Sequence, residues 1–251
     1  MIEAKGLSKA FVKKGARKET VRAINDVSFV AEDGAITGLL GANGAGKSTT
    51  LRIISSLIKP DSGTATVDGH DVIDSALGAR KNLGFLPHNA GVYPRLTARE
   101  NIIYYAELSG LSRREALHRC DDLIEMLDMS GFSDRRTEGF SQGQKTKVAL
   151  ARALVHKPKS LILDEPTNGL DVMATRKLRT ILRRLKEAGH CILISSHVMQ
   201  EVSVLCDQVA IISNGEIACC NSVSGLLEQT GQNDLEDAFV VAIGESIEEE
   251  L

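Results

Sequence analysis

The stretch Gly41-Ala42-Asn43-Gly44-Ala45-Gly46-Lys47-Ser48 decides the fold of this chain. It fits the pattern G-x-x-x-x-G-K-[ST] at every fixed position, and it lies between an apolar run, residues 35–40, and a helical stretch, residues 49–57. Glycines let the backbone curl so that N–H groups point at an anion, and the N-terminus of the following helix adds partial positive charge. The sequence therefore predicts a phosphate-binding loop, with a flexible glycine-rich turn as the alternative.

The chemistry of the loop residues suggests their roles. Lys47 reaches the terminal phosphates of a nucleotide, and the Ser48 hydroxyl is placed for Mg²⁺. We expect the loop and the start of its helix to bind the nucleotide through Gly41, Asn43, Gly44, Ala45, Gly46, Lys47, Ser48 and Thr49.

A second apolar run, Leu161-Ile162-Leu163, ends at the acids Asp164 and Glu165. Ligands bind at the carboxyl ends of parallel strands, so this end should border the crevice of the phosphate loop. We expect Asp164 to hold Mg²⁺, through water, and Glu165 to polarise the attacking water as general base. Acids in this place are otherwise ordinary turn residues, which is the alternative.

The order of the predicted elements indicates an α/β fold. Short strands fill the beginning of the chain, and strands alternate with helices again over residues 158–225, which implies a mostly parallel sheet. Three helices without an intervening strand predict a helical insertion over residues 89–157. Each starts with a capping box, at Thr97-x-x-Glu100, Ser112-x-x-Glu115 and Ser141-x-x-Gln144.

Charge is distributed unevenly along the chain. Residues 187–251 contain 12 of the 33 acids and neither lysine nor arginine, so this segment carries −12 and the rest +9. We predict that residues 226–251 form a solvated acidic tail, with a docking element as the alternative. The basic body suits a nucleotide phosphate better than nucleic acid, because aromatic residues make up only 4% and tryptophan is absent.

Composition excludes several classes of protein. A content of 43% apolar and 25% charged residues is that of a soluble globular chain, and no apolar run approaches the about 20 residues that span a bilayer. The first ten residues include Glu3, Lys5 and Lys9, so no secretory signal is visible. The five cysteines lack C-x-x-C spacing, and we expect free, buried thiols.

Taken in order, five sequence features resemble the ATP-binding subunit of an ABC transporter over roughly residues 1–225. They are the phosphate loop, Phe140-Ser141-Gln142-Gly143-Gln144, residues 161–166, Asn168-Gly169-Leu170-Asp171 and Ser195-Ser196-His197. Residues 95–101 and 235–239 are similar to ABC-2-type exporters, including their sodium-extrusion branch.

The resemblance implies a P-loop NTPase fold with a mostly parallel core sheet, an N-terminal antiparallel β region and an inserted helical subdomain. The ATP-binding core would comprise residues 1–88 and 158–225. Two copies would clasp two Mg-ATP, each ATP lying between the phosphate loop of one copy and the signature segment of the other. Ser141, Gly143 and Gln144 would supply that second contact, and an ordinary N-cap is the alternative reading of Ser141.

Three further residues receive roles from the resemblance. His197 would contact the γ-phosphate, where a structural histidine is the alternative. Asp171 would communicate across the dimer, and it could equally cap the helix that starts at Val172. Phe11 would stack on adenine, and a core phenylalanine is the alternative.

Two departures from the family pattern stand out. Phe140 and Gln142 replace the usual first and third residues of the signature, while Ser141 and Gly143 remain. His88 stands where the family usually has glutamine near Mg²⁺. A neutral imidazole can ligate metal, so we hypothesise that hydrolysis or coupling falls as pH drops toward about 6. A solvent-facing loop residue is the alternative.

The predicted function is that of an ATP-hydrolysing motor subunit that drives transport, toward export, through separate transmembrane permease subunits. The chain would then lie at the cytoplasmic face of the membrane, beside a second copy or a homologous ATPase subunit. Tyr93, Leu96 and the helix at Thr97 are candidate contacts for the permease. The alternatives are a soluble ABC-type ATPase of cofactor assembly without a membrane partner, and a nucleotide sensor that scarcely hydrolyses.

Overall fold

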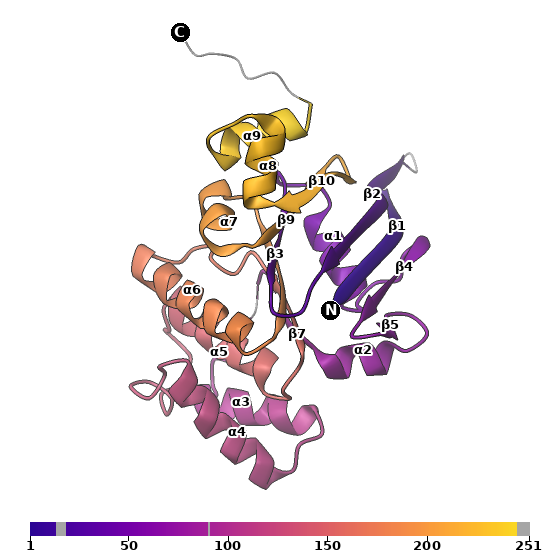
Figure 1. The fold of residues 1–251 in the computed structure, drawn as a ribbon. Coiled ribbons are helices and arrows are strands. Elements are labelled where there is room, and N and C mark those ends of the chain that lie inside the picture. The colour runs from indigo at the N-terminus through magenta and orange to yellow at the C-terminus, as the bar shows by residue number, and fades with distance from the viewer. Residues whose placement is uncertain (14–18, 90, 245–251) are drawn as a thin grey trace.

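Two sheets form the frame of the molecule in the computed structural model, which describes residues 1–13, 19–89 and 91–244 (Figure 1). The smaller sheet is antiparallel with strand order β2-β1-β4-β5. Its strands are β1 (Ile2–Lys13), β2 (Glu19–Ala31), β4 (Ser62–Val67) and β5 (His70–Asp71). Alternate residues Val27, Phe29 and Ala31 are buried, as the period of two in a half-covered strand requires. The predicted antiparallel region is confirmed.

The larger sheet has the order β10-β9-β3-β8-β7-β6, and its neighbours are parallel except for the terminal β10 and β9 pair. Its central strands are buried throughout, which explains why they read as continuous apolar runs. In strand order the bounds are β10 (Glu216–Ser222), β9 (Gln208–Ser213), β3 (Ile36–Leu40), β8 (Cys191–Ser196), β7 (Ser160–Asp164) and β6 (Leu83–Leu86).

Helices cover the larger sheet. Helix α1 (Lys47–Ile54) lies between the two sheets and contacts β1, β2, β4 and β7. Helices α6 (Val172–Glu187) and α7 (Met199–Leu205) contact β8. The short helix α2 (Ala76–Asn82), which follows β5, was not predicted.

The three predicted helices of the insertion are confirmed. They are α3 (Ala98–Leu108), α4 (Arg113–Met126) and α5 (Gln142–Leu154), and they gather below the sheet in Figure 1. Thr97, Ser112 and Ser141 each accept a hydrogen bond from the third helical residue, whose side chain accepts one in return. The capping boxes read from the sequence thus fix where each helix begins.

The prediction of a solvated tail was wrong for residues 226–244. Helix α8 (Val223–Thr230) and helix α9 (Leu235–Ala242) follow β10, and α9 packs on α7 and α8 (Figure 1). Leu226, Leu235, Ala238 and Phe239 are buried in the same cluster as α7. Burial of this apolar face therefore docks α8 and α9 on the body of the protein despite the acidic residues around them. Residues 245–251 lie outside the described residues.

The thiols match the prediction in part. All five cysteines are free, and Cys120, Cys191 and Cys206 are buried, whereas Cys219 is half-buried and Cys220 is exposed. Burial raises the pKa of Cys120 and of Cys191 to about 11, so both stay protonated. None of the helices within the described ranges could span a membrane.

Candidate functional site

The phosphate loop connects β3 to α1, and two of its glycines are required by the packing around them. Gly46 has φ +110°, and a Cβ there would lie 2.6 Å from Ile24 Cγ2 and 2.8 Å from the Ala23 carbonyl oxygen. A Cβ on Gly41 would lie 2.3 Å from the Ile212 carbonyl oxygen. No other residue fits these positions, so the loop can curl tightly between the two sheets.

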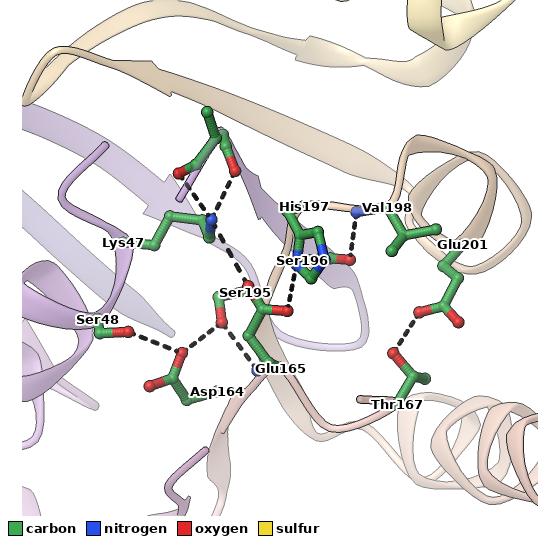
Figure 2. Close-up of polar contacts among 12 residues, drawn as sticks. Lys47, Ser48, Asp164, Glu165, Thr167, Ser195, Ser196, His197, Val198 and Glu201 are labelled. Atoms are coloured by element: carbon green, nitrogen blue, oxygen red, sulfur yellow. Dashed lines mark hydrogen bonds and ion pairs between the residues drawn. The ribbon is translucent and has the colours of Figure 1, made fainter. Parts of the chain in front are cut away.

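Lys47 lies at the start of α1 with only 6% of its surface exposed. Its Nζ donates to the carbonyl oxygens of Gly41 at 2.5 Å and Ala42 at 3.0 Å, and it lies 3.5 Å from Glu165 Oε1 (Figure 2). A buried ammonium group needs such partners, because desolvation of an unpaired charge is costly. The loop thus holds the Lys47 ammonium group in place, and its contact with the terminal phosphates stays a prediction.

Asp164 ends β7 and is 3% exposed. Its Oδ1 accepts hydrogen bonds from Ser195 Oγ at 2.6 Å and from Ser48 Oγ at 3.3 Å. The carboxylate and the Ser48 hydroxyl therefore lie together beneath the loop, and both are the hard oxygen donors that Mg²⁺ prefers. This donor set fits Mg²⁺, and the expected meeting of the two strand ends is confirmed.

Glu165 lies between two positively charged or protonatable side chains. Its Oε2 is 2.6 Å from His197 Nδ1, and its other oxygen faces Lys47 (Figure 2). The Glu165 backbone has φ +52°, a left-handed conformation that is rare for a residue with a side chain. Ser195 Oγ accepts a hydrogen bond from the Glu165 N–H at 2.9 Å, which helps to hold this conformation. The carboxylate and the imidazole thus form one unit at the end of β7 and β8.

Lys47, Ser48, Glu165 and His197 line one cavity of about 460 Å³. Six of the eight residues of the loop and its helix that were predicted to bind the nucleotide line it, and the other two, Gly41 and Ala45, do not. The lining residues are Ala23, Ala42, Asn43, Gly44, Gly46, Lys47, Ser48, Thr49, His88, Glu165, Asn168 and His197.

The signature residues lie elsewhere. Ser141, Gly143, Gln144 and Asp171 line a second cavity of about 420 Å³ between α5 and α6, and none of them lines the phosphate cavity. Ser141 is exposed and caps α5, and Asp171 Oδ1 accepts from the Ala174 N–H at 2.8 Å, so it caps α6. Within one chain, the structure therefore does not bring these residues to the phosphate loop.

The structure places Phe11 away from the phosphate cavity and His88 in its lining. Phe11 is 44% exposed on β1, so the alternative of a core phenylalanine is wrong; it does not line the phosphate cavity. His88 is exposed and lines that cavity. Within the described ranges, no three His, Cys, Asp or Glu side chains gather into a metal site, and the protein oxygens placed together for Mg²⁺ are those of Ser48 and Asp164. A role for His88 at the metal stays a prediction.

Several residues that shape the site had no role predicted for them from the sequence. Ser195 bridges Asp164 and Glu165, and Asn168 lines the cavity. The Thr167 hydroxyl donates to Glu201 Oε2 (Figure 2). A polar residue at the end of a buried strand run was the available signal for Ser195, whereas Thr167 and Glu201 are far apart in sequence.

A glycine-rich loop between a parallel strand and a helix, with an acidic pair at the end of a nearby strand, defines a P-loop nucleoside triphosphatase. Comparison with known proteins shows which family of this class the chain belongs to. The sequence profile of the ABC transporter family matches residues 24–168. The chain belongs to the ABC transporter ATP-binding family, and it is an ATPase subunit of that class, as predicted.

The most similar relatives include two Bacillus subtilis proteins. The ABC transporter ATP-binding protein NatA is 41% identical over 225 residues, covering 89% of this chain and 92% of the relative. The linearmycin resistance ATP-binding protein LnrL is 34% identical, covering 97% of this chain and 78% of the relative.

Solved structures agree with the sequence relatives. An ATP-binding subunit of an ABC transporter superimposes with a TM-score of 0.83 at 28% identity, covering 97% of this chain and 99% of that one. A dimeric ATP-binding cassette in a post-hydrolysis state with ADP and Pi superimposes with a TM-score of 0.79 at 26% identity, covering 88% and 98%.

Proposed function

We propose that two copies of this chain close around two Mg-ATP, and that hydrolysis lets them part and drives transport through separate permease subunits. One observation carries the proposal: Lys47, Glu165 and His197 line a single cavity beside the phosphate loop, and Asp164 accepts a hydrogen bond from Ser48, which also lines it. Two relatives are named as an ABC transporter ATP-binding protein and a resistance ATP-binding protein, which supports export as the direction.

Each side chain has a defined task in this proposal. Lys47 binds the terminal phosphates as a point charge, and Ser48 and Asp164 hold Mg²⁺ directly or through water. Bound Mg²⁺ neutralises charge on the phosphate oxygens. Glu165 accepts the proton of the attacking water. His197 Nδ1 donates to the Glu165 carboxylate, and Nε2 would donate to a phosphate oxygen when the ring carries its second proton.

The position of Ser141 supports a second copy. Its helix begins with N–H groups that no helical carbonyl satisfies, and an exposed helix N-terminus favours an anion. The cap lines a cavity other than the phosphate cavity, so it could serve ATP only in another chain. The dimeric relative bound to ADP and Pi is consistent with such pairing.

A groove on the helical insertion supports a permease partner. It encloses about 370 Å³ between α3, α5 and the segment after β6. Arg152 lies in it, with its guanidinium 3.5 Å from the centroid of the Tyr105 ring, and Nη1 donates to the Gly91 carbonyl oxygen at 2.7 Å. None of the described residues lining the groove carries a carboxylate, and Tyr93 is exposed nearby.

A partner helix that inserts an acidic side chain would complement this half-buried cation. We infer that the permease docks here and holds the chain at the cytoplasmic face of the membrane. Relatives named as transporter proteins give no support to the alternative of a cofactor-assembly ATPase.

The experiment compares the wild type, Glu165→Gln and Lys47→Ala in Mg-ATP. We expect Glu165→Gln to lose hydrolysis and accumulate as a nucleotide-bound dimer in analytical ultracentrifugation, because the amide cannot take the proton of water. Lys47→Ala should remain monomeric, because a charge-assisted contact to phosphate is lost. Wild-type rates of hydrolysis in Glu165→Gln would remove Glu165 from its proposed role.

The permease contact has its own test. Arg152→Gln should keep ATP-driven dimerisation but lose co-purification with the polytopic membrane subunit, since the groove would lack its cation. Retained co-purification would contradict this docking site.

A further inference from the structure

Two segments that flank the phosphate cavity are joined by two side-chain contacts (Figure 2). One segment is residues 165–168, which follow β7, and the other is residues 197–201, which follow β8 and enter α7. The first contact joins Glu165 to His197, inside the cavity. The second joins the Thr167 hydroxyl to the Glu201 carboxylate.

The second contact lies outside the cavity. Neither Thr167 nor Glu201 lines it, and both are half-buried. Neither residue is therefore placed to touch the nucleotide, and any effect on hydrolysis must pass through neighbouring residues. The neighbours are Glu165, two residues before Thr167, and His197, four residues before Glu201.

The Glu165 turn needs external support. Its left-handed backbone is strained, and such a conformation persists only where surrounding contacts fix it. Ser195 Oγ binds its N–H, and its carbonyl oxygen accepts from the Asn168 N–H at 3.1 Å. The Thr167 side chain ties the same turn to α7.

The start of α7 also needs support. Its N-cap, Val198, has no capping side chain, and the Val198 N–H donates instead to Ser196 Oγ at 3.0 Å. Glu201 lies in the first turn, where its charge suits the helix dipole, and its carboxylate accepts from Thr167. His197, immediately before Val198, therefore takes its position from a helix start that Glu201 connects to the Glu165 turn.

We propose that the Thr167–Glu201 hydrogen bond is a positioning contact that sets the spacing of Glu165 and His197 for hydrolysis. This inference rests on the proposed ATPase function and adds a contact that positions its reacting groups. Small displacements of groups that act together in a transition state lower kcat more than ground-state binding.

Replacement of Thr167 by valine or serine separates the hydroxyl from the shape of the side chain. Thr167→Val keeps the shape and removes the donor, so kcat should fall about tenfold while KM for ATP changes by no more than about twofold. Thr167→Ser retains the hydroxyl and should restore most of kcat. Thr180→Val is the matched control, because Thr180 Oγ1 bonds to the Arg176 carbonyl oxygen on the exposed side of α6.

Amide hydrogen exchange provides a readout that does not depend on hydrolysis. In Thr167→Val, exchange should accelerate in residues 165–171 and 197–201 but not in β3 or α5. Glu201→Gln keeps an acceptor oxygen and should fall between the wild type and Thr167→Val in both measurements. It also carries the test if Thr167→Val does not fold.

The proposal is overturned if Thr167→Val hydrolyses ATP at the wild-type rate, or if Thr167→Ser is impaired as strongly as Thr167→Val. These failures differ from failure of the proposed function. If the proposed function fails, the wild-type chain does not hydrolyse ATP. Hydrogen exchange in the wild type and in Thr167→Val would still test the Thr167–Glu201 contact.

Discussion

Replacing Ser195 by alanine should weaken both the fold and the reaction. Ser195 is fully buried; its hydroxyl donates to Asp164 Oδ1 at 2.6 Å and accepts from the Glu165 N–H at 2.9 Å. A hydrogen bond to a charged group contributes about 1.5–3 kcal/mol and a neutral one about 1 kcal/mol. We therefore expect Ser195→Ala to lower the free energy of unfolding by about 3 kcal/mol, which for a chain of this size lowers Tm by about 6–12 °C.

Calorimetry and steady-state hydrolysis on the same samples test this reasoning. The control is Ser160→Ala, at the opposite end of β7, because Ser160 Oγ is also buried and also donates to a carboxylate, Asp68 Oδ2, at 3.0 Å. The control should lose about 1.5–3 kcal/mol of stability with unchanged kcat, whereas Ser195→Ala should also lose at least about tenfold in kcat. Unchanged stability of Ser195→Ala, or an equal loss of kcat in Ser160→Ala, would refute the argument.

Two further predictions concern residues away from the reacting groups. Burial lowers the pKa of His156, whose Nε2 donates to the Leu83 carbonyl oxygen at 3.1 Å, so the unfolded chain binds the proton more readily and stability should fall as pH drops below about 6.5. His156→Gln should reduce this acid loss in urea unfolding at pH 5 and pH 7.5, and identical pH dependence in the two proteins would contradict it. Phe239→Ala should lower the free energy of unfolding by about 3–5 kcal/mol because the ring is buried against the main core, and a change below about 1 kcal/mol in urea titration would show that α9 is not docked.

The parts of the site that sequence could predict are local in the chain. The phosphate loop, the acids that end β7 and the capping boxes each lie within a few residues, and backbone chemistry gives each such pattern one dominant outcome. The Ser195 bridge and the Thr167–Glu201 contact join residues about 30 positions apart, so only the packing of β7 beside β8 reveals them.

The error at the C-terminus has a physical cause. Leu235, Ala238 and Phe239 have helical spacing behind the N-cap Asp234, but the helix is short and its first turn holds Glu236 and Asp237. Acidic residues at a helix N-terminus are stabilising, so the charges that suggested solvation support the helix instead. The signature residues and the phosphate loop line different cavities of one chain. A sequence pattern cannot show whether the signature binds a nucleotide held by a second chain.

The docking of α9 on α7 has a consequence for work with this protein. His197, which lines the nucleotide cavity, lies two residues before α7, so the packing of α9 on α7 supports this side of the cavity. A tag or fluorescent label attached after Gly244 leaves the contact between α9 and α7 in place. Truncation before Leu235 would expose an apolar patch on α7. A loss of turnover in such a shortened protein would then reflect greater mobility of the residues around His197, not the loss of a functional group in the removed segment.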